Sequence, residues 1–165
     1  MHEESETQSA ENETQSNFKI EDCPGKMRSL NTRKESRGDD LVLAVDLKIE
    51  VVCGISVGDA LLGAQDGHVS KFLEGLYDYS GELQYWAISN ISYSSDYEDC
   101  DLEIGTRKVK GVKLSKFQIE PANMRQCKLV FVASFLPEKG ELEKLAELLM
   151  RDVLVSAAPP PDLFG

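Results

Sequence analysis

One stretch, LVLAVDLKIEVVC at residues 41–53, constrains the fold more than any other part of the chain. Apolar residues occupy every second position along it, and Asp46, Lys48 and Glu50 stand between them. Side chains alternate between the two faces of a strand, so the pattern predicts a strand of about ten residues with one apolar and one solvated face. A strand of this length needs partner strands and a cover, which predicts a β-rich domain around it.

The balance of charge limits the kinds of partner. The chain has 165 residues, enough for one domain with a sizeable core. Its 29 acidic residues exceed its 18 basic residues, which gives a formal net charge of -11. Uniform negative charge is repelled by phosphate backbones and anionic membranes, so the composition disfavours generic DNA binding and favours a protein partner. We expect no membrane association, because no apolar run is long enough to span a bilayer.

The first 16 residues are acidic and polar, with no lysine or arginine. They predict a disordered acidic tail and lack the features of a signal peptide, so we expect a cytoplasmic protein. The four cysteines are widely spaced and form no C-x-x-C motif, so we expect free thiols in that compartment. These cysteines are Cys23, Cys53, Cys100 and Cys127.

Later segments supply partners for the long strand. Residues 17–21 predict a first short strand, and the basic segment 26–37 predicts a loop that leads into the long strand. Two short helices are predicted at 56–64 and 68–77, from apolar residues at helical spacing. Further strands are predicted at 86–94, 112–119, 128–135 and 152–156, of which the middle two form an antiparallel hairpin.

A final helix completes the predicted domain. It opens at Pro137, and its apolar stripe includes Leu145 and Leu149, which we expect to be core. We therefore predict a mainly β (α+β) domain: a β-sandwich or open barrel of about five to seven strands with a C-terminal amphipathic helix. This domain spans residues 17–156, and residues 157–165 form a proline-rich C-terminal tail.

Catalysis and metal binding have little support in the sequence. The only histidines are His2 and His68, and the sequence indicates no orienting partner for either. No closely spaced Cys or His pair predicts a zinc site. The acidic run 96–103 lacks the glycine and the final glutamate of a calcium loop. We therefore expect no enzyme activity, catalytic residue, metal or cofactor.

Two basic runs, residues 26–37 and 107–116, could line one groove and contact the phosphates of single-stranded nucleic acid. Nearby aromatic residues could offer base stacking, namely Phe117, Tyr93, Tyr97 and Trp86. The alternative is that the second run pairs with the acidic run before it, across a hairpin. The cations of the two runs are Lys26, Arg28, Arg33, Lys34, Arg37, Arg107, Lys108, Lys110, Lys113 and Lys116.

The C-terminal tail and the acidic run are the candidate protein-binding surfaces. An apolar pair at the end of a stiff proline spacer can dock into a pocket on a partner. This Asp-Leu-Phe ending resembles that of bacterial sliding-clamp-binding peptides, with Pro160 where a glutamine is usual. The candidate residues are Asp162, Leu163 and Phe164 in the tail, and Asp96, Glu98, Asp99, Asp101 and Glu103 in the run.

Residues 31 to about 160 resemble a family of uncharacterised small β-rich proteins from tailed phages and prophages. The matching stretches are NTRKESRGDDLVLAVDLKIEV, KLSKFQIEP and LEKLAELLMRDVLVSAAPP. The resemblance implies a phage origin, and hence the cytoplasm of a bacterial host, but no activity.

We therefore expect a non-enzymatic phage accessory protein that binds a host or phage protein, in DNA replication or recombination or in counter-defence. The alternative is a single-stranded nucleic-acid-binding protein that uses the two basic runs.

Overall fold

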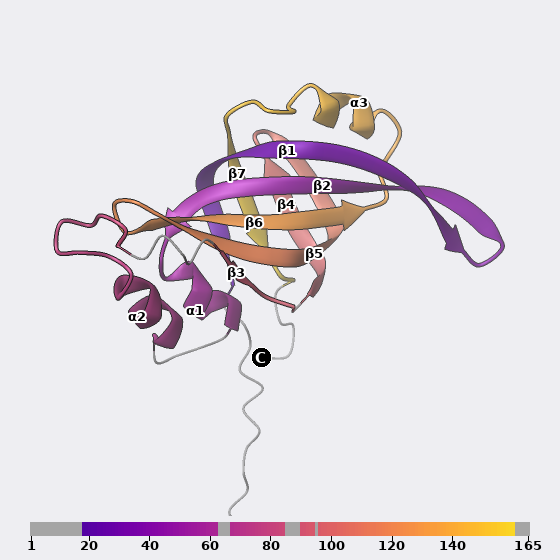
Figure 1. Cartoon of the computed structure of the whole chain (residues 1–165). Coiled ribbons are helices and arrows are strands. Elements are labelled where there is room, and N and C mark those ends of the chain that lie inside the picture. Colours follow the sequence, from indigo (N-terminus) through magenta and orange to yellow (C-terminus); the bar gives the residue numbers. More distant parts are fainter. Residues whose placement is uncertain (1–17, 63–66, 85–89, 95, 161–165) are drawn as a thin grey trace, which may run out of the picture.

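Long antiparallel strands make up most of the structure (Figure 1). The computed structural model describes residues 18–62, 67–84, 90–94 and 96–160. The strands in these residues are β1 Ile20–Arg37, β2 Asp40–Gly54, β3 Ile91–Ser92, β4 Tyr97–Ile104, β5 Arg107–Ala122, β6 Gln126–Phe135 and β7 Val153–Ala158. All except β3 close into an antiparallel barrel in the order β1–β2–β6–β5–β4–β7, with β7 returning to β1, while β3 pairs with β5 outside it. The predicted mainly β class is confirmed.

Two long strands close the barrel because each is shared between two neighbours. β1 pairs with β7 along residues 20–25 and with β2 along residues 25–37. β5 pairs with β4 along residues 97–104 of that strand and with β6 along residues 126–134. Each neighbour in the ring is thereby hydrogen-bonded to the next. The barrel is closed, so the predicted sandwich or open barrel is wrong on this point.

Irregularities in the ladders lie where these two strands bend. The β1–β2 register shifts between Met27 and Ser29, and the β5–β6 register shifts between Ser115 and Gln118. Lys116, inside the second irregularity, has a φ of 53°, a left-handed conformation that few non-glycine residues adopt. An extra residue on one strand raises the local twist and bends that strand. These irregularities therefore allow β1 and β5 to turn from one neighbour to the other.

The alternation of β2 builds the core, as the sequence predicts. Val45, Leu47 and Ile49 have no exposed surface and fill the barrel interior. Asp46 and Lys48 point the other way and lie on the outside of the barrel, where Asp46 is half-buried and Lys48 is exposed. The pattern of the sequence thus sets which face of this strand is the inner one.

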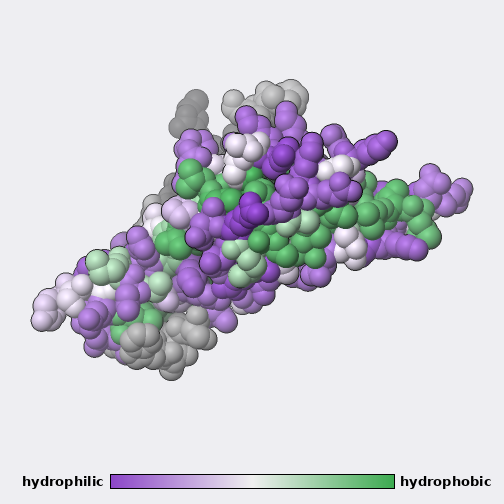
Figure 2. Space-filling model, turned by 90° about the horizontal axis from the view of Figure 1, so that it is seen from above, coloured by the Kyte–Doolittle hydropathy of each residue, from purple (hydrophilic) through white to green (hydrophobic). Residues whose placement is uncertain are grey.

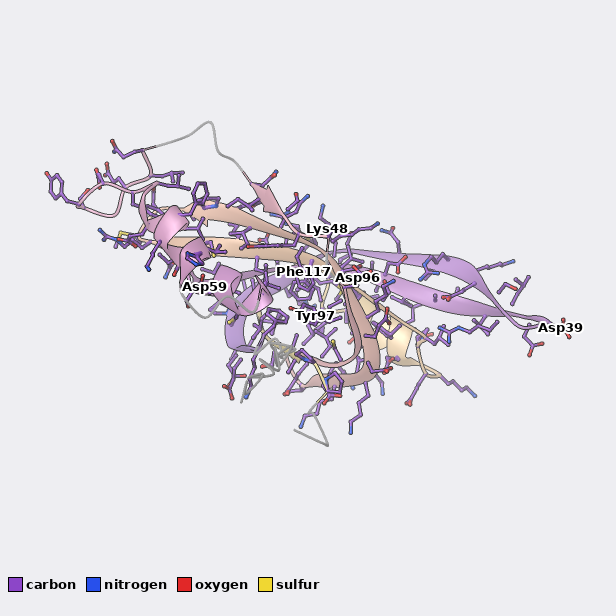
Figure 3. All side chains as sticks on the ribbon, turned by 90° about the horizontal axis from the view of Figure 1, so that it is seen from below. Asp39, Lys48, Asp59, Asp96, Tyr97 and Phe117 are labelled. Carbon is purple, nitrogen blue, oxygen red and sulfur yellow. The ribbon has the colours of Figure 1, made fainter. Side chains whose placement is uncertain are left out.

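An aromatic cluster packs within the core (Figure 3). The ring centroid of Phe117 lies 5.5 Å from that of Phe18, 5.7 Å from that of Tyr97 and 5.8 Å from that of Phe131. Aromatic pairs at such distances contribute about 0.5–1.5 kcal/mol each beyond their burial. Because Phe117 is fully buried, it is not placed to stack on a nucleic-acid base.

The two short helices predicted after β2 are present, as α1 Val57–Leu62 and α2 His68–Glu74 (Figure 1). The Oδ1 atom of Asp59 in α1 accepts hydrogen bonds from the N–H groups of Val69, at 2.9 Å, and Ser70, at 3.2 Å. Burial acts to raise the pKa of Asp59, but the hydrogen bonds from Ser70 and Val69 outweigh it, and the pKa is lowered. The carboxylate therefore holds the first turn of α2 against α1.

The C-terminal helix is shorter than predicted. It forms α3 Glu141–Ala146, which Figure 1 shows above β1. Leu145 is fully buried as expected, but Leu149 is 40% exposed, so its predicted place in the core is wrong. α3 ends at Ala146, so Leu149 lies beyond the helix, and the next residue, Met150, has a φ of 62° and donates its N–H to the carbonyl of Met27 at 3.0 Å.

One segment predicted as a loop is a strand. The basic segment 26–37 forms most of β1, so that prediction is wrong. The hairpin predicted from 112–119 and 128–135 is confirmed as β5–β6. Of the predicted strand 86–94 the structure describes β3, and residues 85–89 lie outside the described residues.

The predicted tails fall largely outside the described residues, which exclude 1–17 and 161–165. β7 extends through Ala158, so the described chain continues as strand into the segment predicted as the C-terminal tail. Among the helices that the structure describes, none combines the length and the apolar character needed to cross a membrane.

Replacing Leu145 with alanine should destabilise the fold far more than replacing Leu149 with alanine. Leu145 is fully buried, whereas Leu149 keeps 40% of its surface exposed. We expect Leu145→Ala to lower the free energy of unfolding by about 2–5 kcal/mol, because it leaves a cavity. Leu149→Ala should change it by about 1 kcal/mol or less. Denaturant unfolding of both variants measures the difference, and an unchanged midpoint for Leu145→Ala contradicts the packing described here.

Candidate protein-binding arm and basic groove

β1 and β2 continue past the barrel as a two-stranded arm, defined as residues 33–44 (Figure 1). β2 pairs with β6 only from Val45 onward, and β1 pairs with β7 only as far as Gly25. The arm ends in a two-residue turn in which Gly38 has a φ of 63°, a conformation that glycine adopts easily. Figure 3 shows Asp39 at this tip, far from the barrel. A two-stranded ribbon is at best marginally stable in water, so the arm depends on contacts between its own side chains.

One face of the arm carries a row of ion pairs. The Nε atom of Arg33 donates to Asp46 at 2.9 Å, and its Nη1 atom donates to Glu35 at 3.0 Å. Arg37 follows, with Nη2 at 3.6 Å from the same Glu35 carboxylate. Exposed ion pairs contribute only about 0.2–1 kcal/mol each, and of these three only Arg33–Asp46 joins β1 to β2. The cations on this face are therefore compensated by neighbouring carboxylates of β1 and β2.

The other face of the arm is apolar and open. Leu41 and Leu43 share the parity of the fully buried Val45, yet they are 71% and 46% exposed. Lys34 is the register partner of Leu43, so it stands beside that leucine, and it makes no ion pair with a described residue. Figure 2 shows hydrophobic surface along the projecting arm. The inward face of β2 thus continues past the barrel that would have covered it.

Cations from both basic runs meet in one groove on the outside of the barrel. This groove crosses β1, β2, β5 and β6 and has a volume of about 540 Å³. Its charged lining residues are Arg33, Asp46, Lys48, Lys113 and Lys116. Polar side chains complete it, among them those of Ser29, Asn31, Ser115, Gln118 and Ser134. Four cations against one carboxylate make this groove locally basic on an acidic protein.

Neighbouring acids compensate part of this positive charge. Arg33 is held by Asp46 and Glu35, as described above. The Nζ atom of Lys113 lies 3.4 Å from Asp96 and 3.7 Å from Glu98. Lys48 and Lys116 form no ion pair with a described residue and are exposed. The uncompensated charge of the groove therefore comes from these two lysines, and Figure 3 marks the position of Lys48.

The remaining cations of the first basic run lie apart from the groove. Lys26 lies 3.8 Å from Asp152, whose side chain is 97% exposed. Arg28 forms an ion pair with Glu50, which is buried, and lies 3.9 Å from Glu120. Arg28 is therefore a partner of a buried carboxylate in the barrel wall.

The acidic run and the second basic run face each other across the β4–β5 hairpin. Glu103 is the register partner of Lys108, and both line a second groove, of about 490 Å³, with Asp101 and Lys110. Asp96 and Glu98 flank Lys113 at the other end of the hairpin, as given above. The predicted pairing of these two runs across a hairpin is confirmed, and the ion pairs between them join Lys113 to Asp96 and Glu98.

Other predicted positions fall elsewhere. Asp99 is exposed, with a φ of 53°, at an irregularity in β4, and Arg107 is the half-buried register partner of Ile104. His68 begins α2 at the surface. The described residues hold no cluster of three or more His, Cys, Asp or Glu side chains arranged to bind a metal ion. The tail residues Asp162, Leu163 and Phe164 lie outside the described residues.

Leu41 and Leu43 are absent from the sites predicted from the sequence. Their parity with Val45 is visible in the sequence, and by itself it assigns them to the core. Recognising 26–37 as a strand would have shown that β1 and β2 form a long hairpin that includes both leucines. This segment is predicted as a loop from its sequence, so that signal is missed. Nothing in the sequence marks where β6 stops pairing with β2.

Replacing Arg28 with alanine should destabilise the barrel, although Arg28 belongs to a basic run. The change leaves the buried Glu50 carboxylate without its cation, which costs about 1–3 kcal/mol. Lys26→Ala is the matched control, because its partner Asp152 is solvated and the expected change is within about 0.5 kcal/mol. Chemical unfolding of the two variants measures the difference. If Arg28→Ala were as stable as Lys26→Ala, Arg28 would be a free surface cation and not the partner of Glu50.

Comparison of the chain with protein-family models, with curated proteins and with solved structures finds no match. The resemblance to tailed-phage proteins therefore remains a prediction from the sequence. Inference about function depends on the arm and the basic groove themselves.

Proposed function

We propose that this chain is a non-enzymatic phage accessory protein that binds another protein through its arm. The observation that supports the proposal is the exposure of Leu41 and Leu43 on the inward parity of β2. Exposed apolar side chains gathered on a projecting element are typical of protein-docking surfaces. The backbone ladder and the Arg33–Asp46 ion pair on the opposite face hold the two strands together, while the apolar face stays open to a partner.

The chemistry of the arm indicates the surface that it fits. Leu41 and Leu43 need an apolar pocket, and the ammonium group of Lys34 beside them favours a carboxylate at the edge of that pocket. Burying the two leucines contributes about 1.5–3 kcal/mol each. After the cost of association, this supports about micromolar affinity at best. We therefore infer a reversibly bound protein with an apolar pocket bordered by carboxylates.

The phage resemblance suggests where such a partner acts. A host or phage protein of DNA replication or recombination fits the proposal, and so does a host protein whose blocking serves counter-defence. The acidic run 96–103 is the weaker docking surface, because Asp96 and Glu98 are already paired with Lys113 and Lys108 stands opposite Glu103. The arm is therefore the surface on which the proposal depends.

Disrupting the arm should abolish partner capture without unfolding the barrel. A photo-crosslinking amino acid at Ser36, the register partner of Leu41, reports contacts on the apolar face in a bacterial lysate. The double substitution Leu41→Asp and Leu43→Asp should reduce crosslinking to a defined protein at least about tenfold, since each burial is lost. Leu154→Asp is the control, because Leu154 is 51% exposed but lies on β7.

Mass spectrometry of the crosslinked peptide identifies the contacted surface. The proposal requires that the wild type and the Leu154→Asp control crosslink to the same protein. The crosslinked peptide of that protein should belong to an apolar surface flanked by Asp or Glu. Equal capture by the arm variant contradicts the proposal. Crosslinks between two copies of this chain alone would instead show that the arm is a self-association surface.

A second candidate function is the binding of single-stranded nucleic acid in the basic groove. The observation that favours it is that Lys48 and Lys116, from different strands, face one groove without an acidic partner among the described residues. Ser, Asn and Gln side chains beside them can donate to phosphate oxygens. The overall charge of -11 opposes this function, and the buried Phe117 removes one predicted stacking residue.

If the groove binds a phosphate backbone, the two lysines should account for its dependence on salt. Fluorescence anisotropy with labelled single-stranded DNA should then give a log-log salt slope of about -0.7 for each phosphate neutralised, or roughly -1.4 in total. Lys48→Ala with Lys116→Ala should remove the binding, while Lys26→Ala should leave it unchanged. Absence of binding at low salt, or binding insensitive to the double substitution, rules out the groove.

A further inference from the structure

Two cysteines that are far apart in the sequence meet on adjacent strands. Cys53 in β2 and Cys127 in β6 are direct register partners. Their Sγ atoms lie 3.7 Å apart, and both thiols are free. The widely spaced cysteines of the sequence gave no sign of this contact, because it depends on the register of a non-local strand pair.

The backbone at this position already suits a disulfide bond. Residues directly opposite each other in an antiparallel pair have Cα atoms about 4.5–5.5 Å apart. Disulfides bridge Cα atoms about 4.4–6.8 Å apart, so no change of register is required. The Sγ atoms need only approach from van der Waals contact, which rotation of the two side chains can provide.

The two thiols differ in access and in hydrogen bonding. Cys53 is half-buried, whereas Cys127 is fully buried. A hydrogen bond from Cys53 lowers the pKa of Cys127, and the same bond, together with burial, raises the pKa of Cys53. Cys53 is thus the thiol that an outside molecule can reach, and Cys127, with its Sγ atom 3.7 Å away, lies in place to resolve a mixed disulfide on Cys53.

We propose that Cys53 and Cys127 form a thiol–disulfide exchange site for low-molecular-weight disulfides such as oxidised glutathione. Cys53 loses its proton to solvent, and its thiolate attacks one sulfur of glutathione disulfide, which forms a mixed disulfide and releases one glutathione thiolate that takes up a proton. Cys127 then attacks the Sγ atom of Cys53, forming the Cys53–Cys127 bond and releasing the second glutathione. One disulfide is reduced and one is formed, and the two thiol protons leave with the two glutathione molecules.

The other two cysteines are placed differently. Cys23 lies on β1, and its thiol donates to the carbonyl of Glu21 at 3.6 Å. Cys100 is buried in β4, and its thiol donates to the carbonyl of Glu98 at 3.6 Å. Cys53 lies at the end of β2 opposite to the arm, so this site is independent of the proposed docking function.

Peptide mapping of the full-length protein tests the site. The native protein is incubated with oxidised glutathione, then alkylated, denatured and digested without reduction. We expect the loss of two of its four thiols, one Cys53–Cys127 linked peptide, and two glutathione thiols released per chain. Reduction with dithiothreitol should restore all thiols. The mapping uses the native chain, so its result does not depend on any variant folding.

Three variants separate the two roles. Cys127→Ser should accumulate glutathione on Cys53, because no neighbouring thiol resolves the mixed disulfide. Cys53→Ser should slow thiol loss at least about tenfold, since the accessible thiol is gone. Cys23→Ser is the matched control and should behave as the wild type. A lasting glutathione adduct on wild-type Cys53, a Cys23–Cys53 link, or four unchanged thiols would each overturn the proposal.

Discussion

The sharing of β1 and β5 between two neighbours each is the constraint on which the rest of the structure depends. β1 pairs with β7 at its start and with β2 over the rest, β5 pairs with β4 and β6 in a similar way, and the ring of neighbours is thereby complete. The irregularities near Met27 and Lys116 make this change of partner possible by adding twist where the strands bend. Closure then encloses the alternating apolar residues of β2 and the ring of Phe117, and it fixes which surfaces face outward.

The same arrangement creates both candidate sites. β1 leaves β7 early, so its later part and the start of β2 have no third strand beside them, and an arm results. Bending of β5 brings Lys116 to the groove that already contains Lys48. Two other cations of this groove are compensated by close neighbours, Arg33 by Asp46 and Lys113 by Asp96. Binding capacity therefore concentrates where this local compensation is missing.

The sequence predicts those features that follow from local periodicity. The alternation around Val45 predicts β2 and its inner face, and the two apolar segments after Lys110 predict the β5–β6 hairpin. It fails for β1, because residues 26–37 carry charges on both parities and show no apolar face. Helical spacing places Leu149 on the stripe of Leu145, but it does not show that the helix ends at Ala146, before Leu149. The Cys53–Cys127 contact and the shared groove depend on long-range register, which no local pattern contains.

The outer edge of β1 along the arm has a further consequence, for solubility. Among the described strands, β1 is paired with β2 alone beyond Gly25. From Ser29 onward, its other edge therefore offers backbone N–H and C=O groups to any passing strand. Such edges promote edge-to-edge aggregation unless charged side chains obstruct it. Arg33, Lys34 and Arg37 stand along this edge, and their bulk and charge discourage a foreign strand from joining the sheet. The basic run, a candidate nucleic-acid contact in the sequence, thus also obstructs edge-to-edge pairing along the arm.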